Sequence, residues 1–234
     1  MRSTVPFLVV NPKSYLYGEA ALALARAADA AAKKTGLRIY FTCPFSDIRY
    51  IHAHTDAIIV TAQAMESLKP GRGMGHLLPE ALYEAGARAT FLNHAENPMT
   101  MAELAKTIAR ARELGIETIA CADSLAEGTA IAAFHPDILL CEPTDLIGTG
   151  KTADDSYTTS IVAKIRSIDP TIGIMIASGI TTADDVYRVV RLGADGSGAT
   201  SGILNAPDPA ERIMEMAEAI VRAAEAREAT EGAA

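Results

Sequence analysis

Residues 139 to 152 read Leu139-Leu140-Cys141-Glu142-Pro143-Thr144-Asp145-Leu146-Ile147-Gly148-Thr149-Gly150-Lys151-Thr152 and join a short apolar run to a glycine-bearing loop. The run is bounded by polar residues, glycine and proline, and it predicts a buried strand that ends on the carboxylate of Glu142. Pro143 fixes the direction in which the chain leaves, because its ring locks φ and disfavours helix in the preceding residue. A possible base at a strand end, followed by a loop that can fold over a ligand, is typical of active sites. The alternative is an ordinary loop with a solvated glutamate.

The same pattern of an apolar run followed by a helical segment recurs along the chain. The expected strands are residues 5–10, 37–43, 57–60, 89–93, 117–121, 138–141, 173–177 and 194–199. The expected helices are residues 17–34, 44–54, 78–85, 98–114, 124–134, 156–168, 183–192 and 207–226. Strict alternation predicts an α/β fold with a parallel sheet, and eight such units predict a closed (β/α)8 barrel. A doubly wound open sheet would need a glycine fingerprint after the first strand, and Asn11-Pro12-Lys13-Ser14 is not one.

The length and composition fit one barrel domain. The chain has 234 residues, and we expect a single domain over residues 1–234 with a disordered tail at 227–234. Apolar residues make up 49%, yet Trp is absent and aromatic residues are few, so Ala, Val, Ile and Leu must fill the core. Such a core suits strands that helices cover on both faces.

The charge and the cysteines limit the partners and the compartment. The net charge is −8 with no basic patch, so nucleic acid is not an expected partner. No apolar stretch is long enough to span a membrane, and the N-terminus lacks a cleavable signal pattern, which predicts a cytoplasmic protein. Cys43, Cys121 and Cys141 show no CxxC spacing and are expected to be buried, reduced thiols.

Polar residues stand near the ends of several expected strands. In a barrel all carboxyl ends of the strands meet at one rim, so side chains far apart in sequence converge there. The residues concerned are Asn11, Lys13, Gln63, His94, Glu96 and Glu142. Ser178-Gly179 and Ser201-Gly202 follow the last two strands, where barrels often bind phosphate through backbone N–H groups.

These residue types suit proton abstraction next to a carbonyl. Glu142 can act as a base if closure removes its water, His94 can hydrogen-bond an oxygen and move a proton, and Lys13 can stabilise an anion. Glu96 is expected to be structural and paired with Lys13. Each group also has a structural alternative, since His94 can be a plain hydrogen-bonding residue and Lys13 a surface charge. No two histidines share a strand-end cluster, so no metal site is expected.

Three segments resemble the signature segments of triosephosphate isomerases in their order and spacing. They are Asn11-Pro12-Lys13, Asn93-His94-Ala95-Glu96-Asn97, and Glu142-Pro143 with Ile147-Gly148-Thr149-Gly150-Lys151-Thr152-Ala153. The resemblance covers nearly the whole chain, and Gly75-His76-Leu77-Leu78-Pro79-Glu80 is most similar to the compact archaeal-type branch. It implies a TIM barrel that interconverts dihydroxyacetone phosphate and glyceraldehyde 3-phosphate through an enediolate, without a cofactor, in glycolysis and gluconeogenesis.

The resemblance also implies roles for individual residues. Glu142 would be the general base, His94 the electrophile and proton shuttle, and Asn11 and Lys13 substrate-binding groups. Gly148 would belong to a closing lid, and phosphate-binding amides are expected at Ser178, Gly179, Ser201 and Gly202. The family's loop after strand three docks on another subunit, which implies a homodimer or homotetramer.

Some positions depart from the usual pattern of that family. Pro12 replaces a bulky apolar residue, Ala95 a serine and Met74 a threonine, and Gly196-Ser197-Gly198 stands where larger apolar residues are usual. These changes leave the proton-transfer groups in place but reshape their surroundings. An isomerase of a related small ketose phosphate, such as a tetrulose phosphate, and a weakly active phosphosugar-binding barrel are therefore alternatives. A carbon–carbon lyase on the same barrel is a third alternative. Such an enzyme would need a second lysine at a strand end or a pair of carboxylates, and no expected strand ends on a second lysine.

Overall fold

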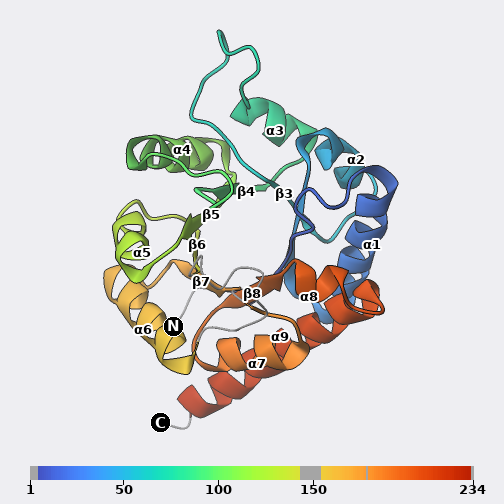
Figure 1. Cartoon of the computed structure of the whole chain (residues 1–234), viewed down its shortest axis with the longest axis vertical. Coiled ribbons are helices and arrows are strands. Elements are labelled where there is room, and N and C mark those ends of the chain that lie inside the picture. The colour runs from blue at the N-terminus through green and yellow to red at the C-terminus, as the bar shows by residue number, and fades with distance from the viewer. Residues whose placement is uncertain (1–4, 143–153, 178, 233–234) are drawn as a thin grey trace.

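The computed structural model describes residues 5–142, 154–177 and 179–232. Eight parallel strands pair in sequence order and close into a barrel, β1 pairing with β8 (Figure 1). The strands are β1 (Phe7–Val10), β2 (Arg38–Cys43), β3 (Ile59–Ala62), β4 (Ala89–Leu92), β5 (Glu117–Ala122), β6 (Ile138–Cys141), β7 (Gly173–Ile176) and β8 (Gly196–Ala199). The predicted (β/α)8 barrel is confirmed.

Helices surround the barrel and cover its outer face (Figure 1). They are α1 (Gly18–Thr35), α2 (Ile48–His52), α3 (Pro79–Ala85), α4 (Met101–Leu114), α5 (Leu125–Ala132), α6 (Asp155–Ile168), α7 (Ala183–Arg191), α8 (Ser201–Leu204) and α9 (Pro209–Glu231), with a 3-10 turn, η1, at Phe45–Asp47. Left-handed glycines such as Gly36 and Gly115 end α1 and α4. In the described part of the chain, no helix has both the length and the apolar character that a membrane span requires.

Two apolar layers form the core. The larger one fills the space between strands and helices, and alanines of α1 such as Ala21, Ala25 and Ala28 let that helix pack closely. The smaller one fills the barrel interior and includes Phe7, Tyr40 and Met175. Side chains thus plug the barrel, and ligands can reach only its ends.

Strand β8 carries glycines on its barrel-facing side. A Cβ on Gly196 would lie 2.5 Å from the ring of Phe7, and a Cβ on Gly198 would lie 2.7 Å from Cε of Met175. Phe7 in turn packs edge-on against Tyr40, with ring centroids 5.6 Å apart. Large side chains from β1 and β7 therefore occupy the space that β8 leaves open.

The three cysteines are free and buried, as the sequence predicts. Burial raises the pKa of the Cys43 and Cys141 thiols to about 12, and it raises that of Cys121 as well. All three are therefore protonated and unreactive near neutral pH.

The last helix is longer than the sequence predicts. α9 continues past the expected end at Ala226 to Glu231, so residues 227–231 are helical where the sequence predicts a tail. Arg227 donates hydrogen bonds to the carbonyl oxygens of Ala194 (2.7 Å) and Val190 (3.3 Å). These contacts fasten the end of the helix to the barrel.

Candidate active site

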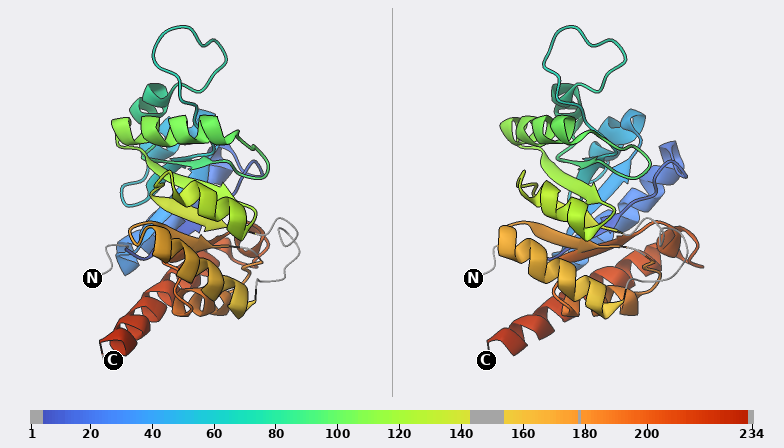
Figure 2. Two further views of the ribbon diagram at one scale, coloured as in Figure 1. Left: turned by 90° about the vertical axis from the view of Figure 1, so that its left-hand side faces the viewer. Right: turned by 60° about the vertical axis from the view of Figure 1, so that its left-hand side comes forward.

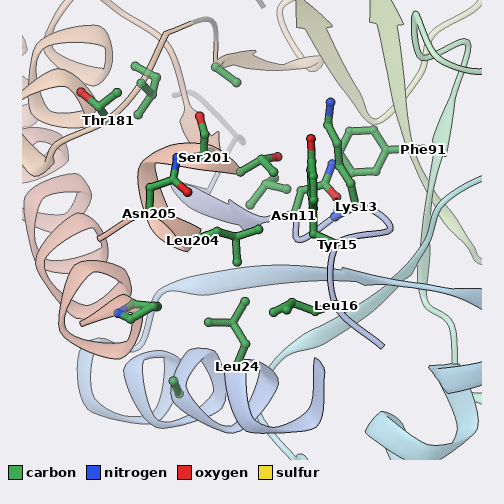
Figure 3. Close-up of a pocket in the computed structure, with 18 of the residues that line it drawn as sticks. Asn11, Lys13, Tyr15, Leu16, Leu24, Phe91, Thr181, Ser201, Leu204 and Asn205 are labelled. Atoms are coloured by element: carbon green, nitrogen blue, oxygen red, sulfur yellow. Dashed lines mark hydrogen bonds between the residues drawn. The ribbon is translucent and has the colours of Figure 1, made fainter. Parts of the chain in front are cut away.

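A cavity of about 990 Å³ opens at the carboxyl end of the strands. Several of the predicted site residues line it together: Asn11, Lys13, His94, Glu96, Glu142, Gly179 and Ser201. Figure 3 shows Lys13 beside Phe91, with Ser201 and Thr181 coming from other segments of the rim. Val9, Leu140 and Met175 add apolar surface to its lining. Residues distant in sequence thus converge as the barrel topology requires.

Lys13 is held in an unusual backbone conformation. Its φ is +49°, a left-handed value that is uncommon outside glycine. Its N–H donates to Oδ1 of Asn11 (2.9 Å), and its carbonyl accepts from Nε2 of Gln63 (2.8 Å). Gln63 is not among the residues that line the cavity in the described structure, and it reaches the site through this contact with Lys13.

The ammonium of Lys13 pairs with Glu96. The Nζ–Oε1 distance is 2.6 Å, and the Lys13 side chain is 20% exposed while that of Glu96 is 63% exposed. The hydrogen bond from Lys13 lowers the pKa of Glu96, so the carboxylate stays charged. The predicted pairing is thus present, and it directs the cation within the cavity.

His94 is held as a neutral imidazole. Its Nδ1 accepts a hydrogen bond from the N–H of Glu96 (3.1 Å), which leaves Nε2 as the protonated nitrogen. Burial, and then the positive charge of Lys13, lower the pKa of His94 below its usual 6.5. At neutral pH the ring can therefore donate a hydrogen bond to a substrate oxygen without carrying a charge.

Asn93, the residue before His94, also has a left-handed backbone, with a φ of +55°. Its side chain accepts from the N–H of Met99 (2.9 Å) and donates to the carbonyl of Cys121 (2.9 Å) and to Oε1 of Glu127 (3.0 Å). These contacts fix the turn that presents His94. The role of Glu127 is not predictable from the sequence, because a glutamate in α5 gives no local signal of a contact with the end of β4.

Glu142 stands where the sequence predicts, just after β6. Its N–H donates to the carbonyl of Ala122 (2.9 Å), which extends the β5–β6 pairing by one residue. The side chain lines the large cavity and also a smaller one of about 210 Å³, which Asn93 and Glu127 share. The lid predicted around Gly148 lies outside the described residues.

The predicted phosphate-binding positions divide into three groups. Gly179 and Ser201 line the cavity. Gly202 is buried behind the cavity wall, against the backbone of Ile180 and Thr181. Ser178 lies outside the described residues. The short helix α8 begins at Ser201, as is usual for phosphate sites of barrels.

The cavity continues as an apolar extension between α1 and α8. Leu16, Leu24 and Leu204 line this part (Figure 3).

Two residues that depart from the pattern of the resembling family, Pro12 and Ala95, lie outside this extension. Pro12 is buried beside Lys13, and Ala95 is exposed and lines the smaller cavity. Neither side chain carries a group that can exchange a proton.

Comparisons with known proteins agree with this geometry. A family model described as triosephosphate isomerase matches residues 6–220. The triosephosphate isomerase of Methanobacterium bryantii is 33% identical over 216 residues, which cover 90% of this chain and 95% of the relative. The enzyme of Methanopyrus kandleri is 35% identical over 218 residues, covering 91% and 96%, and that of Sulfolobus acidocaldarius 30% over 226 residues, covering 95% and 98%.

Proposed function

The chain belongs to the triosephosphate isomerase family, and we propose on that premise that it interconverts dihydroxyacetone phosphate and glyceraldehyde 3-phosphate. The observation that carries the proposal is the shared cavity, in which Lys13, His94 and Glu142 line the same space as Gly179 and Ser201. A base, a neutral proton donor and a cation thus surround a place for a small phosphorylated sugar.

Glu142 takes the proton from the carbon next to the carbonyl group, and the electron pair moves onto the carbonyl oxygen. Neutral His94 donates a hydrogen bond from Nε2 to that oxygen and moves protons between the two oxygens of the enediolate. Lys13 stabilises the negative charge that develops. Glu142 then returns its proton to the neighbouring carbon, which completes the isomerisation. The pairing of a carboxylate base with a neutral imidazole is the established one for this family.

The phosphate would lie against the loops after β7 and β8, at Gly179 and Ser201, and Asn11 would contact the substrate. Because the chain has a net charge of −8, the anion must be captured by local groups and not by the overall field. Lys13 supplies a positive charge on one side of the cavity, and backbone N–H groups supply donors on the other.

A coupled assay tests the substrate. We expect kcat/KM for dihydroxyacetone phosphate to exceed that for a tetrulose phosphate by about tenfold or more, since an added hydroxymethylene group must find space and partners. Equal or better turnover of the tetrulose phosphate would reassign the substrate to the four-carbon sugar. Binding of both without turnover would favour a phosphosugar-binding barrel.

We also propose that the chain works as a homodimer or homotetramer, in the cytoplasm, where reduced thiols persist and sugar phosphates of glycolysis and gluconeogenesis occur. The connection between β3 and α3 projects from the body of the barrel (Figure 2). Met74 in this loop is 101% exposed and so does not pack on its own barrel. A protruding apolar side chain of this kind often marks an interface.

Light scattering of Met74→Asp tests the docking of this loop. We expect wild type to be a dimer or larger at micromolar concentration and the variant to dissociate, because a buried, unpaired carboxylate strongly opposes association. Lys69→Asp is the matched control, since it adds the same carboxylate to an exposed position of the same loop. A monomeric wild type, or equal dissociation of both variants, would contradict docking through Met74.

A further inference from the structure

The loop that follows β7 and the connection between β8 and α9, which contains the short helix α8 and is called the loop after β8, touch each other through their backbones. A Cβ on Gly202 would lie 2.5 Å from the carbonyl oxygen of Ile180 and 2.7 Å from Cα of Thr181, so only glycine fits there. Thr181 and Ser201 line the large cavity at this junction. The spacing between the two loops therefore sets the width of this part of the cavity wall.

Arg212 joins the two loops from the outer side. It lies near the start of α9, whose N-terminus Asp208 caps by accepting from the N–H groups of Ala210 (2.8 Å) and Glu211 (3.1 Å). Nη1 of Arg212 donates to the carbonyl oxygen of Thr181 and to that of Gly202, the latter at 3.3 Å. One planar cation thus holds one carbonyl from each loop.

The Arg212 side chain does not belong to the large cavity. It lines a hollow on the other side of the loops, together with Thr182 and Asp184, and its side chain is 22% exposed. Its Nε donates to Glu215 one turn further along α9 (3.1 Å), which fixes the plane of the guanidinium. Arg212 therefore acts on a ligand in the cavity only through the loops that it holds.

Thr181 is also held from its other side. The carboxylate of Asp185 accepts from the N–H and the hydroxyl of Thr181, both at 3.0 Å. The loop after β7 is thus fixed by α7, while the loop after β8 is joined to it by Arg212. Without the guanidinium, the partial negative charges of two carbonyl oxygens would also stand unneutralised behind an anion site.

We propose that Arg212 is a positioning residue for the substrate phosphate: it sets the distance between the loops after β7 and β8 and neutralises their outward carbonyls. This rests on the proposed function, which places the phosphate at these loops. Arg212 contributes to binding of the phosphate group in the ground state and the transition state alike, so its loss weakens binding more than turnover.

The test compares Arg212→Met and Arg212→Lys with Arg222→Met. Arg222 lies on the same helix, is exposed and lines the same outer hollow, so it is a matched control. For Arg212→Met we expect KM and the inhibition constant of inorganic phosphate to rise about tenfold, because two carbonyls lose a charged donor. We expect kcat to change by less than about threefold. Arg212→Lys should be intermediate, since an ammonium keeps the charge but loses the Nε bond to Glu215 that orients the guanidinium, and Arg222→Met should resemble wild type.

An unchanged KM and phosphate inhibition in Arg212→Met, or an equal rise in Arg222→Met, would overturn the proposal. A fall in kcat with unchanged KM would overturn it as well. If circular dichroism shows that Arg212→Met does not fold, Arg212→Lys decides by the same criteria. Calorimetric binding of inorganic phosphate by wild type and variants separates this inference from the proposed function: a wild type that binds phosphate without isomerase activity refutes the function, while the variants still test Arg212.

Discussion

Replacing Glu142 with glutamine is expected to lower kcat by at least about 10²-fold while KM stays close to the wild-type value. Glutamine keeps the shape of the side chain but cannot accept the proton from carbon, and general acid–base groups typically contribute about 10²–10⁴-fold. Because the phosphate is expected to be held by other residues, inhibition by inorganic phosphate should not change. Steady-state kinetics of the purified variant measures both quantities.

The control for this variant is Glu84→Gln, which makes the same change on an exposed position of α3. It is expected to leave kcat unchanged. Near-normal turnover in Glu142→Gln would assign proton abstraction to another group of the cavity. A matching loss of phosphate inhibition would instead mean that the substitution disturbs the cavity as a whole.

Replacing Lys13 with methionine is expected to lower kcat/KM by about 10²–10³-fold, because a preorganised charge no longer stabilises the developing oxyanion. The same change should raise the pKa of His94. The cation at position 13 disfavours a second positive charge on the imidazole, whereas the charge of Glu96 favours it. Methionine removes the first effect and keeps a side chain of similar length.

The raised pKa of His94 in Lys13→Met determines in which direction the pH profile of activity moves. In wild type the lowered pKa of His94 keeps the imidazole neutral to a lower pH than that of an ordinary histidine. In Lys13→Met the imidazole becomes protonated at a higher pH, so residual activity should start to fall at a higher pH on acidification. An NMR titration of the histidine rings reports the pKa directly. Lys33→Met, which removes an exposed lysine paired with Asp29 and Asp56, is the control and should leave His94 unchanged.

A pKa of His94 that stays the same in Lys13→Met would show that burial alone keeps the ring neutral. Unchanged kcat/KM would remove Lys13 from the reaction and leave it a structural partner of Glu96. The two measurements are independent. The NMR titration reports the charge of His94 in the ground state, whereas kcat/KM reports the stabilisation of the transition state.

The sequence predicted the barrel because its signals are local. Most strands contain a short apolar run, as in β6 (Ile138–Cys141), and a helix follows each strand; β8, with Gly196-Ser197-Gly198, is the exception to the apolar pattern. The convergence of Lys13, His94 and Glu142 then followed from topology, since parallel strands of a barrel share one rim. The pairing of Lys13 with Glu96 was predicted from their places near strand ends and is present at 2.6 Å.

What the sequence did not predict depends on contacts between distant segments. The expected helix at 44–54 is divided into η1 and the short α2. The four-residue helix α8 is too short to show a period. The extension of α9 past Ala226 depends on hydrogen bonds from Arg227 to the carbonyls of Val190 and Ala194. The support that Glu127 and Arg212 give to the site likewise arises only once the helices pack on the barrel.

The glycines of β8 have a consequence for how this barrel can change during evolution. Besides the side chains of Phe7 and Met175, the backbone oxygens of Phe7 and Val9 would lie 2.5 Å and 2.6 Å from a Cβ at Gly196 and Gly198. A smaller side chain at position 7 or 175 leaves these backbone oxygens in place, so a larger residue in β8 would also require β1 to shift, and overpacking a barrel interior is itself destabilising. No single change at Phe7 or Met175 therefore opens these positions to a larger residue, and stepwise substitution in this barrel is confined to glycine there.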